Sequence, residues 1–336
     1  MSAPEDDRSV TQLADAAFRL ALAGDEAGAI RTYATALRKR VGRSMPAFMH
    51  LSVLRAKGKD ALADRFERLA LDLGADISFA GVRAEPDLSR GIAEYEQFLA
   101  AGRINARMVA RYAQLLSLAG DGVGLERIMD PSRLLRVVQV DGGAPLGNDV
   151  AAYLSSDAPR ATWHDTFRST RQVHHIPHVD EIDHPALNRL FGAVRGEIDR
   201  YLTDIDAIDH PFFRWRPVET AFGAWGLIST GAGHNVPHIH PQGWLTGVYY
   251  AAWRGPIASE PVDQEGALHI APDPAGDAAC PGWAKAIVAP TPGTLVIMPS
   301  YYLHHTFPAR PGSLRIALPF DVVDRRSFVT LAELDA

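Results

Sequence analysis

A pair of histidines in the C-terminal half of the chain has the spacing of a metal site. His238 and His240 stand two residues apart, just before the apolar run Leu245–Tyr250. In an extended segment, residues i and i+2 point to the same face, so both imidazoles can reach one ion. Imidazole is a ligand for iron, copper, zinc and nickel alike. The pair therefore predicts a transition-metal site without naming the metal.

A third ligand has to come from elsewhere in the chain, and we predict that it is a histidine near residue 304. The segment 292–305 contains, in order, a Pro-Gly turn, an apolar strand and the pair His304-His305. Adjacent residues of a strand point to opposite faces, so only one of this pair can join the site. The chain between His240 and this segment leaves room for several strands.

Arg315 is a candidate for binding an anion near this site. It lies eleven residues after His304, in the apolar run Leu314–Leu318. A buried arginine needs a partner because an unpaired buried charge is costly. The planar guanidinium matches a carboxylate that accepts two parallel hydrogen bonds. We therefore expect Arg315 to bind a carboxylate.

These motifs resemble the 2-oxoglutarate/iron(II) oxygenases, and in particular a bacterial group with the patterns HxHP…SGVYY and PGxLxxFPSxxxH followed by an arginine. The corresponding stretches are 238–241, 246–250 and 292–304, followed by Arg315. Order and spacing agree, and the resemblance covers roughly residues 185–323. The register of the last pattern favours His304 over His305.

The resemblance implies a role for each of these residues. The implied metal ligands, which also form the catalytic centre, are His238, His240 and His304. Arg315 would clamp the distal carboxylate of 2-oxoglutarate, and Tyr250 and Thr246, which share a strand face, would help to bind this co-substrate. The implied cofactors are Fe(II) and 2-oxoglutarate. The implied reaction is hydroxylation of a substrate, with release of succinate and CO2.

One position departs from the wider superfamily. The usual facial triad is two histidines and one carboxylate, and His240 stands where the Asp or Glu would be. A neutral ligand at this position leaves more positive charge on the metal. Two interpretations follow: either three histidines hold the iron, or His240 lies next to the ligands and a water takes its place.

Short β-type runs must position these side chains. Five of them, separated by Gly, Pro, Asp and Asn, span 220–229, 244–253, 267–270, 294–298 and 314–322. Many short punctuated strands favour a sandwich or barrel, and the resemblance implies the double-stranded β-helix, or jelly roll. One amphipathic helix precedes them, with an apolar face made by Leu187, Leu190, Phe191, Val194, Ile198, Tyr201 and Leu202.

The first third of the chain is predicted to be helical. Residues 11–37 form a helical hairpin with its break at Gly24-Asp25, and weaker hairpins are predicted at 46–73 and 88–118. The first hairpin resembles a tetratricopeptide repeat, on the pattern Leu13, Ala17, Leu20, Gly24, Ala29, Tyr33 and Ala36. A plain helical bundle is the alternative. We expect this region to hold a peptide or protein substrate, or to mediate homodimerisation.

Turn signals at 141–145 and 155–159 indicate where the helical part ends. The predicted organisation of this α+β multidomain protein is therefore a tetratricopeptide-like domain at 1–125, a linker and entry segment at 126–184 and a jelly-roll oxygenase domain at 185–336. A length of 336 residues fits more than one domain.

Composition restricts the partners. A net charge of −6 gives no electrostatic basis for binding nucleic acid, and no basic cluster indicates a membrane surface. The sequence shows neither a signal peptide nor an apolar run long enough to span a membrane. A single cysteine, Cys280, excludes an internal disulfide framework and favours the cytoplasm. The expected substrate is a peptide, a protein or a small molecule.

Two other functions compete with the oxygenase. A three-histidine cupin dioxygenase shares the HxH pair, but it expects a Glu soon after that pair, where this chain has Pro241–Leu245, and it gives Arg315 no role. A non-catalytic interaction protein built on the helical repeats is the second alternative. Retention of the three histidines and of Arg315 argues against loss of the chemistry.

Overall fold

The chain folds into two compact units, Met1–Pro86 and Asp87–Ala336. The computed structural model describes residues 10–39, 54, 59–73, 88–102, 104–156, 161–167, 169–255, 265–272 and 286–325. The division falls before the boundary predicted at 125/126, because the helical hairpin at 88–118 belongs to the second unit. None of the helices in these described segments is both long enough and apolar enough to cross a membrane.

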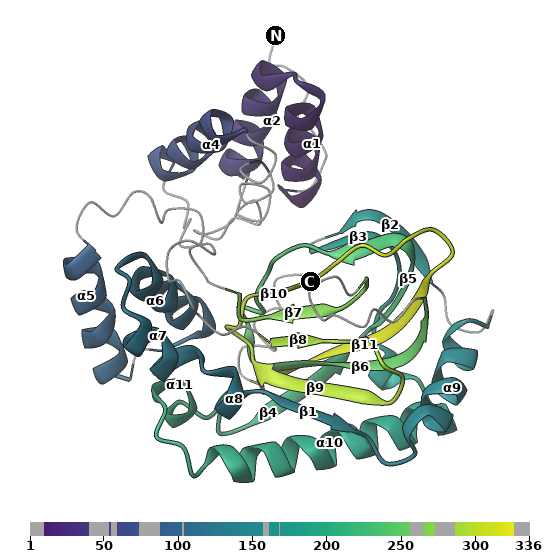
Figure 1. Ribbon diagram of the computed structural model, residues 1–336. Helices are drawn as coiled ribbons and strands as arrows, with labels where there is room; N and C mark the ends of the chain where they lie inside the picture. The colour runs from purple at the N-terminus through teal and green to yellow at the C-terminus, as the bar shows by residue number, and fades with distance from the viewer. Residues whose placement is uncertain are drawn as a thin grey trace. The chain divides into compact units, whose positions relative to one another are not determined.

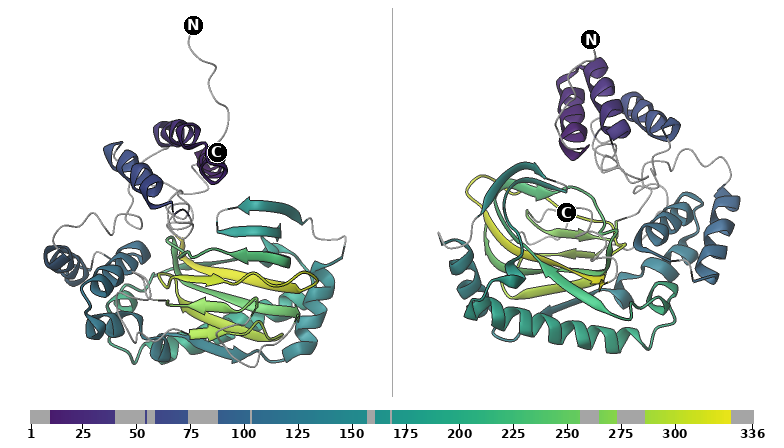
Figure 2. Two further views of the ribbon diagram at one scale, coloured as in Figure 1. Left: turned by 45° about the horizontal axis from the view of Figure 1, so that its top comes forward. Right: turned by 180° about the vertical axis from the view of Figure 1, so that it is seen from behind.

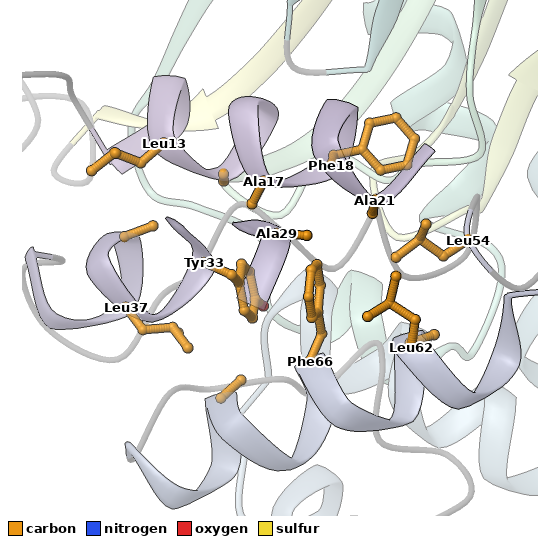
Figure 3. Close-up of a cluster of buried hydrophobic side chains, with 14 residues drawn as sticks. Leu13, Ala17, Phe18, Ala21, Ala29, Tyr33, Leu37, Leu54, Leu62 and Phe66 are labelled. Carbon is orange, nitrogen blue, oxygen red and sulfur yellow. The ribbon is translucent and has the colours of Figure 1, made fainter. Parts of the chain in front are cut away.

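The first unit contains α1 (Val10–Ala23), α2 (Glu26–Lys39) and α4 (Asp60–Asp72). The predicted break between the first two helices is confirmed: Gly24 has φ +90°, and the following amide of Asp25 donates to the Leu20 carbonyl at 3.0 Å. This is the left-handed helix end that glycine adopts without strain. Small residues of α1 and α2 let the helices approach, and the rings of Tyr33 and Phe66 stack at 4.5 Å between α2 and α4 (Figure 3).

The other two predicted hairpins have different outcomes. At 46–73 the structure describes α4 and a few residues before it, so most of the first half lies outside the described residues. At 88–118 the hairpin is confirmed as α5 (Leu88–Ala100) and α6 (Ala106–Leu118), followed by α7 (Gly122–Met129). The N-terminal region is therefore helical where it is described, and its tetratricopeptide character stays a prediction.

The second unit is built on two antiparallel sheets (Figure 1). The large sheet has the order β1-β9-β6-β11-β5-β3-β2, with β4 also pairing with β11, and the small sheet has the order β10-β7-β8. The strands of the large sheet are β1 (Arg136–Gln139), β2 (Thr162–Phe167), β3 (Thr170–Ile176), β4 (Thr220–Ala224), β5 (Gly226–Asn235), β6 (Gly243–Arg254), β9 (Thr294–Pro299) and β11 (Leu314–Asp324). Those of the small sheet are β7 (Leu268–Ile270), β8 (Ala286–Val288) and β10 (His304–Thr306). The α+β class and the jelly-roll-like sheet domain predicted from the sequence are confirmed.

The segment 126–184, predicted as a linker, is instead part of this fold. Its strand β1 pairs with β9, β2 pairs with β3, and β3 pairs with β5. It also contains α8 (Pro131–Leu134), α9 (Gly143–Leu154) and the 3-10 helix η2 (Val179–Glu181). The glycines that indicated a loop in the sequence begin α9: Gly142, with φ +93°, is its N-cap. β1 and β2 lie at the two edges of the large sheet, and β3 lies between β2 and β5.

A long helix, α10 (Pro185–Ile205), runs along the outside of the large sheet, followed by the short α11 (Pro211–Arg214) (Figures 1 and 2). The predicted apolar face is buried except for Leu202, which is half-buried. Aromatic rings continue from this face into the sheet: Phe191 lies 5.6 Å from Phe222, which stacks on Phe320 of β11 at 5.4 Å. The helix thereby supports the strand that carries Arg315.

Candidate metal and co-substrate site

The three predicted ligand histidines come together in the second unit. His238 lies between β5 and β6, and its amide and carbonyl pair with those of His304 on β10, both at 3.0 Å. The amide of His240 donates to the Ser300 carbonyl at 2.9 Å. One nitrogen of each imidazole lies within 4.8 Å of the other two. His304, not the neighbouring His305, belongs to this cluster, as the register of the motif predicted.

All three imidazoles are oriented through Nδ1. In His238 this atom lies 2.8 Å from the Val236 carbonyl, and in His304 it lies 2.8 Å from the Tyr302 carbonyl. In His240 it lies 2.6 Å from Oδ1 of Asp321. Because an oxygen occupies each Nδ1, Nε2 is the nitrogen that each ring has available for a metal. Partners of this kind fix the ring and its tautomer in metal-binding histidines.

Burial keeps His238 and His304 uncharged. His238 is 8% exposed and His304 is 6% exposed. Desolvation, together with the nearby His240, lowers the pKa of His238 to about 3, and desolvation lowers the pKa of His304 well below its ordinary value. Neutral imidazole is the form that binds metal, so at neutral pH protons do not compete for these two nitrogens. A cluster of three nearby imidazoles whose Nδ1 atoms face oxygens fits a first-row metal ion such as iron.

The surroundings of His240 differ from those of the other two histidines. Its indole neighbour Trp225 stacks on the ring, with centroids 5.9 Å apart and planes 18° apart. Asp321 Oδ1 is shielded from solvent and makes no hydrogen bond of regular geometry within the described residues. We therefore describe its 2.6 Å approach to Nδ1 as a close contact rather than as an aligned hydrogen bond. A carboxylate thus lies directly behind the histidine that stands where the usual triad has a carboxylate.

Arg315 is buried on β11 and faces the same cavity as the three histidines. Its Nη1 donates to the Gly266 carbonyl at 2.7 Å, and its Nη2 donates to Thr306 Oγ1 at 3.1 Å. Desolvation lowers the pKa of this guanidinium. No carboxylate of the described residues forms an ion pair with Arg315. A buried cation without a counterion is expensive, so the site is suited to an anionic ligand.

Tyr250 and Thr246 both line the cavity from β6, but they lie at different places along it. The strand register puts Tyr250 opposite Ala317, two residues from Arg315, and puts Thr246 opposite Asp321. Burial raises the pKa of Tyr250 to about 12, so its hydroxyl keeps its proton and can donate. Tyr250 is therefore placed near the guanidinium, whereas Thr246 is at the end near His240, and its hydroxyl donates to the Phe320 carbonyl at 3.1 Å.

The cavity lies between the two sheets. The large sheet contributes Leu227, Val248, Met298 and Ala317, and the small sheet contributes Leu268 together with His304 and Thr306. Each of these residues comes from a strand face that points inward, as the period-two alternation requires. The apolar side chains reduce the water around the polar groups, which strengthens electrostatic interactions inside the site.

The sequence analysis missed two residues of this site. Thr306 accepts hydrogen bonds from Arg315 and, at 2.9 Å, from the amide of Asn235. Thr306 could have been predicted from the sequence, because it stands two residues after His304 and therefore lies on the same strand face. Asp321 continues the inward row of Arg315 on β11 by the same alternation. Nothing in the sequence, however, shows that this row ends beside His240.

Comparison with known proteins agrees with the geometry. Residues 223–321 match the family model described as "Putative 2OG-Fe(II) oxygenase". The matched stretch contains the three clustered histidines and Arg315. The resemblance recognised from the sequence is thereby confirmed, and the cofactors of that family are Fe(II) and 2-oxoglutarate (2OG). A search of curated proteins gave no match.

A search of solved structures gave matches at low sequence identity, with TM-scores below 0.5. A prolyl-4-hydroxylase of Pseudomonas putida is 16% identical with a TM-score of 0.42, covering 62% of this chain and 99% of that one. A prolyl hydroxylase of Trichoplax adhaerens, in complex with a hypoxia inducible factor peptide fragment, is 14% identical with a TM-score of 0.43, covering 65% and 93%. HygX of Streptomyces hygroscopicus, with nickel and 2-oxoglutarate bound, is 12% identical with a TM-score of 0.37, covering 57% and 84%.

Proposed function

We propose that the protein is a non-haem Fe(II)- and 2OG-dependent dioxygenase that hydroxylates its substrate and releases succinate and CO2. The metal ligands are His238, His240 and His304, each through Nε2. Arg315 binds the distal carboxylate of 2OG. This assignment adopts the three-histidine interpretation of the site, because one nitrogen of each of the three rings lies within 4.8 Å of the other two, while Asp321 contacts Nδ1 of His240.

The single observation that carries the proposal is the buried guanidinium in the cavity of the histidines. Arg315 donates hydrogen bonds to a carbonyl and a hydroxyl, but no carboxylate pairs with it in the described part of the chain. A dicarboxylate with one end at the metal and the other at Arg315 would supply the missing negative charge. Charge-assisted hydrogen bonds of this kind are about twice as strong as neutral ones.

The other residues have simpler tasks in this proposal. Tyr250 donates a hydrogen bond to the same distal carboxylate, and Thr306 holds the guanidinium in place. Thr246, near His240, contributes to the metal end of the 2OG site. When bound, Fe(II) and 2OG supply the activation of dioxygen and the oxidative decarboxylation. The apolar walls exclude water from the reacting groups.

The cupin alternative accounts for the histidines but not for Arg315. A cupin of this type needs no dicarboxylate, so it offers no reason to bury a guanidinium that lacks a counterion among the described residues. The non-catalytic alternative gives no reason for three clustered histidines whose rings are each oriented through Nδ1. Both alternatives are tested together with the proposal.

The decisive experiment is an anaerobic titration of the metal-free protein with Fe(II), then with 2OG. We expect one Fe(II) per chain and a metal-to-2OG charge-transfer absorption that appears only when both are present. Admission of oxygen should then release succinate in an iron-dependent manner. Iron binding without any 2OG effect would favour the cupin, and binding of neither would favour the non-catalytic protein.

We propose a peptide, protein or small-molecule substrate, and we propose that the helical region predicted at 1–125 holds a peptide or protein substrate or mediates homodimerisation. Size-exclusion chromatography with light scattering measures whether the chain forms a homodimer. Comparing 2OG turnover with peptide pools and with small-molecule libraries separates the substrate classes, because a true substrate raises succinate release above the uncoupled rate.

A further inference from the structure

The carboxylate of Asp321 is the only charged group on the described residues that the structure places against a ligand histidine. Its Oδ1 lies 2.6 Å from Nδ1 of His240, while the Nδ1 atoms of His238 and His304 face neutral carbonyls. The three rings are thus oriented in the same way by three oxygens, and only one of these oxygens carries charge.

The charged oxygen stands behind the ligand that departs from the usual triad. Two histidines and a carboxylate around a divalent ion leave a net charge of about +1, whereas three neutral imidazoles leave about +2. A carboxylate that pairs with the far nitrogen of a ligating imidazole increases the basicity of that ligand and offsets charge at the site. Asp321 is placed to do this for His240.

Neighbouring residues hold both partners of the Asp321–His240 contact in place. On β11, the cavity row of Arg315, Ala317 and Pro319 continues to Asp321, which pairs across the sheet with Thr246 of β6. A face of the His240 ring stacks on Trp225. The ring is therefore clamped in one orientation, with Nδ1 toward the carboxylate.

We propose that Asp321 is a positioning residue for the metal: it holds His240 with Nε2 toward the ion and supplies, one residue further out, the negative charge that position 240 lacks. This inference rests on the proposed function, because it requires His240 to be a metal ligand. The carboxylate itself stays outside the ligand set, which in the described residues consists of three histidines.

The first test compares Asp321→Asn with wild type. The asparagine side chain has nearly the same size as aspartate and keeps an acceptor oxygen, but it carries no charge. A purely steric or hydrogen-bonding role of residue 321 would therefore survive the substitution. We expect the anaerobic affinity for Fe(II), measured by competition with a chelator, to fall by about 10- to 100-fold. The matched control is Asp324→Asn, on the same strand but on the opposite face, which should bind Fe(II) within about twofold of wild type.

Thermal unfolding of the metal-free variants separates positioning from structural support. Asp321→Asn should unfold at the wild-type temperature without metal and gain less stability from added Fe(II). An Fe(II) affinity within twofold of wild type would overturn the inference. So would a metal-free variant that is destabilised in proportion to its loss of affinity, because the carboxylate would then support the fold.

The second test repeats Asp321→Asn in a His240→Asp background. There the metal has a carboxylate ligand of its own and no imidazole for Asp321 to orient, so the same substitution should not weaken Fe(II) binding. An equal weakening in both backgrounds would show that Asp321 acts as a ligand or through its general field, and would overturn the inference.

If wild type binds no Fe(II), the proposed function fails as well. If wild type binds Fe(II) and 2OG while Asp321→Asn matches it, only this inference fails.

Discussion

Arg315→Met gives the most direct test of the co-substrate site. Methionine fills much of the same space without charge, so the variant removes the guanidinium from the cavity while keeping β11 packed. Within the protein, the substitution removes the hydrogen bonds to Gly266 and Thr306, and neither of these involves a ligand histidine. We therefore expect the variant to bind Fe(II) as wild type does and to bind 2OG more weakly.

The magnitude follows from the burial of the group. Arg315 is 4% exposed, so its pairing with a carboxylate occurs away from water. Removing one partner of a buried, hydrogen-bonded charge pair costs about 2–5 kcal/mol. We expect the lower half of this range, roughly a 30- to 300-fold weaker Kd for 2OG, because Tyr250 and Thr306 still offer hydrogen bonds to the carboxylate. Anaerobic titration of the Fe(II)-loaded protein, followed by charge-transfer absorption, measures this change.

The stability of the metal-free Arg315→Met variant should change in the opposite direction from its affinity for 2OG. Removing a buried cation that has no counterion among the described residues should leave the unfolding temperature unchanged or raise it, as is common for groups retained for function. Two results would refute the reasoning. One is a variant that binds 2OG as tightly as wild type, and the other is loss of Fe(II) together with a lower unfolding temperature, which would make Arg315 a structural residue.

The remaining predictions concern the metal, the hydroxyl beside the guanidinium and the pH dependence. His304→Ala should lose stoichiometric Fe(II) binding, measured by metal analysis after gel filtration, whereas the adjacent control His305→Ala should retain it. Thr306→Val removes an acceptor for Arg315 and should weaken 2OG binding in the same titration by roughly 2- to 10-fold, the effect of about 0.5–1.5 kcal/mol. Desolvation lowers the pKa of buried His210 to about 4, so the folded state excludes a proton that the unfolded chain binds below about 6.5, and stability falls as the pH drops through that window. Denaturant unfolding of the metal-free protein should therefore show that His210→Phe loses about 2 kcal/mol less than wild type between pH 7 and pH 5; equal losses would contradict this assignment.

The sequence predicted best where periodicity and burial coincide. The strand runs that became β6, β9 and β11 are long and inward-facing, and their apolar residues meet a core on one or both sides. The apolar face of α10 was predictable for the same reason, because its side chains repeat at helical spacing against one surface. In these elements the local pattern and the tertiary environment require the same residues.

The strands β1, β2 and β3 were missed because their order depends on pairing rather than on local pattern. β1 has only four residues and alternates half-buried with exposed positions along the edge of the sheet. Its conformation is stabilised by hydrogen bonds to β9, a strand far later in the chain. Such a partner is invisible to any window of local sequence, and the turn signals around 141–145 then favoured a linker.

For the same reason, the clustered histidines could be predicted from the sequence, whereas their neighbour Asp321 could not. His238 and His240 could be assigned to one site because two residues of spacing fix a common face in any extended segment. Asp321 lies on another strand, and its approach to His240 follows from the pairing of β11 with β6, where Asp321 stands opposite Thr246. The sequence predicts His240 as a ligand without the usual negative charge, but it does not show which carboxylate lies close enough to supply that charge. The fold brings the carboxylate of Asp321 to Nδ1 of His240. We therefore interpret the histidine at position 240 and the placement of Asp321 as two parts of one proposed metal site.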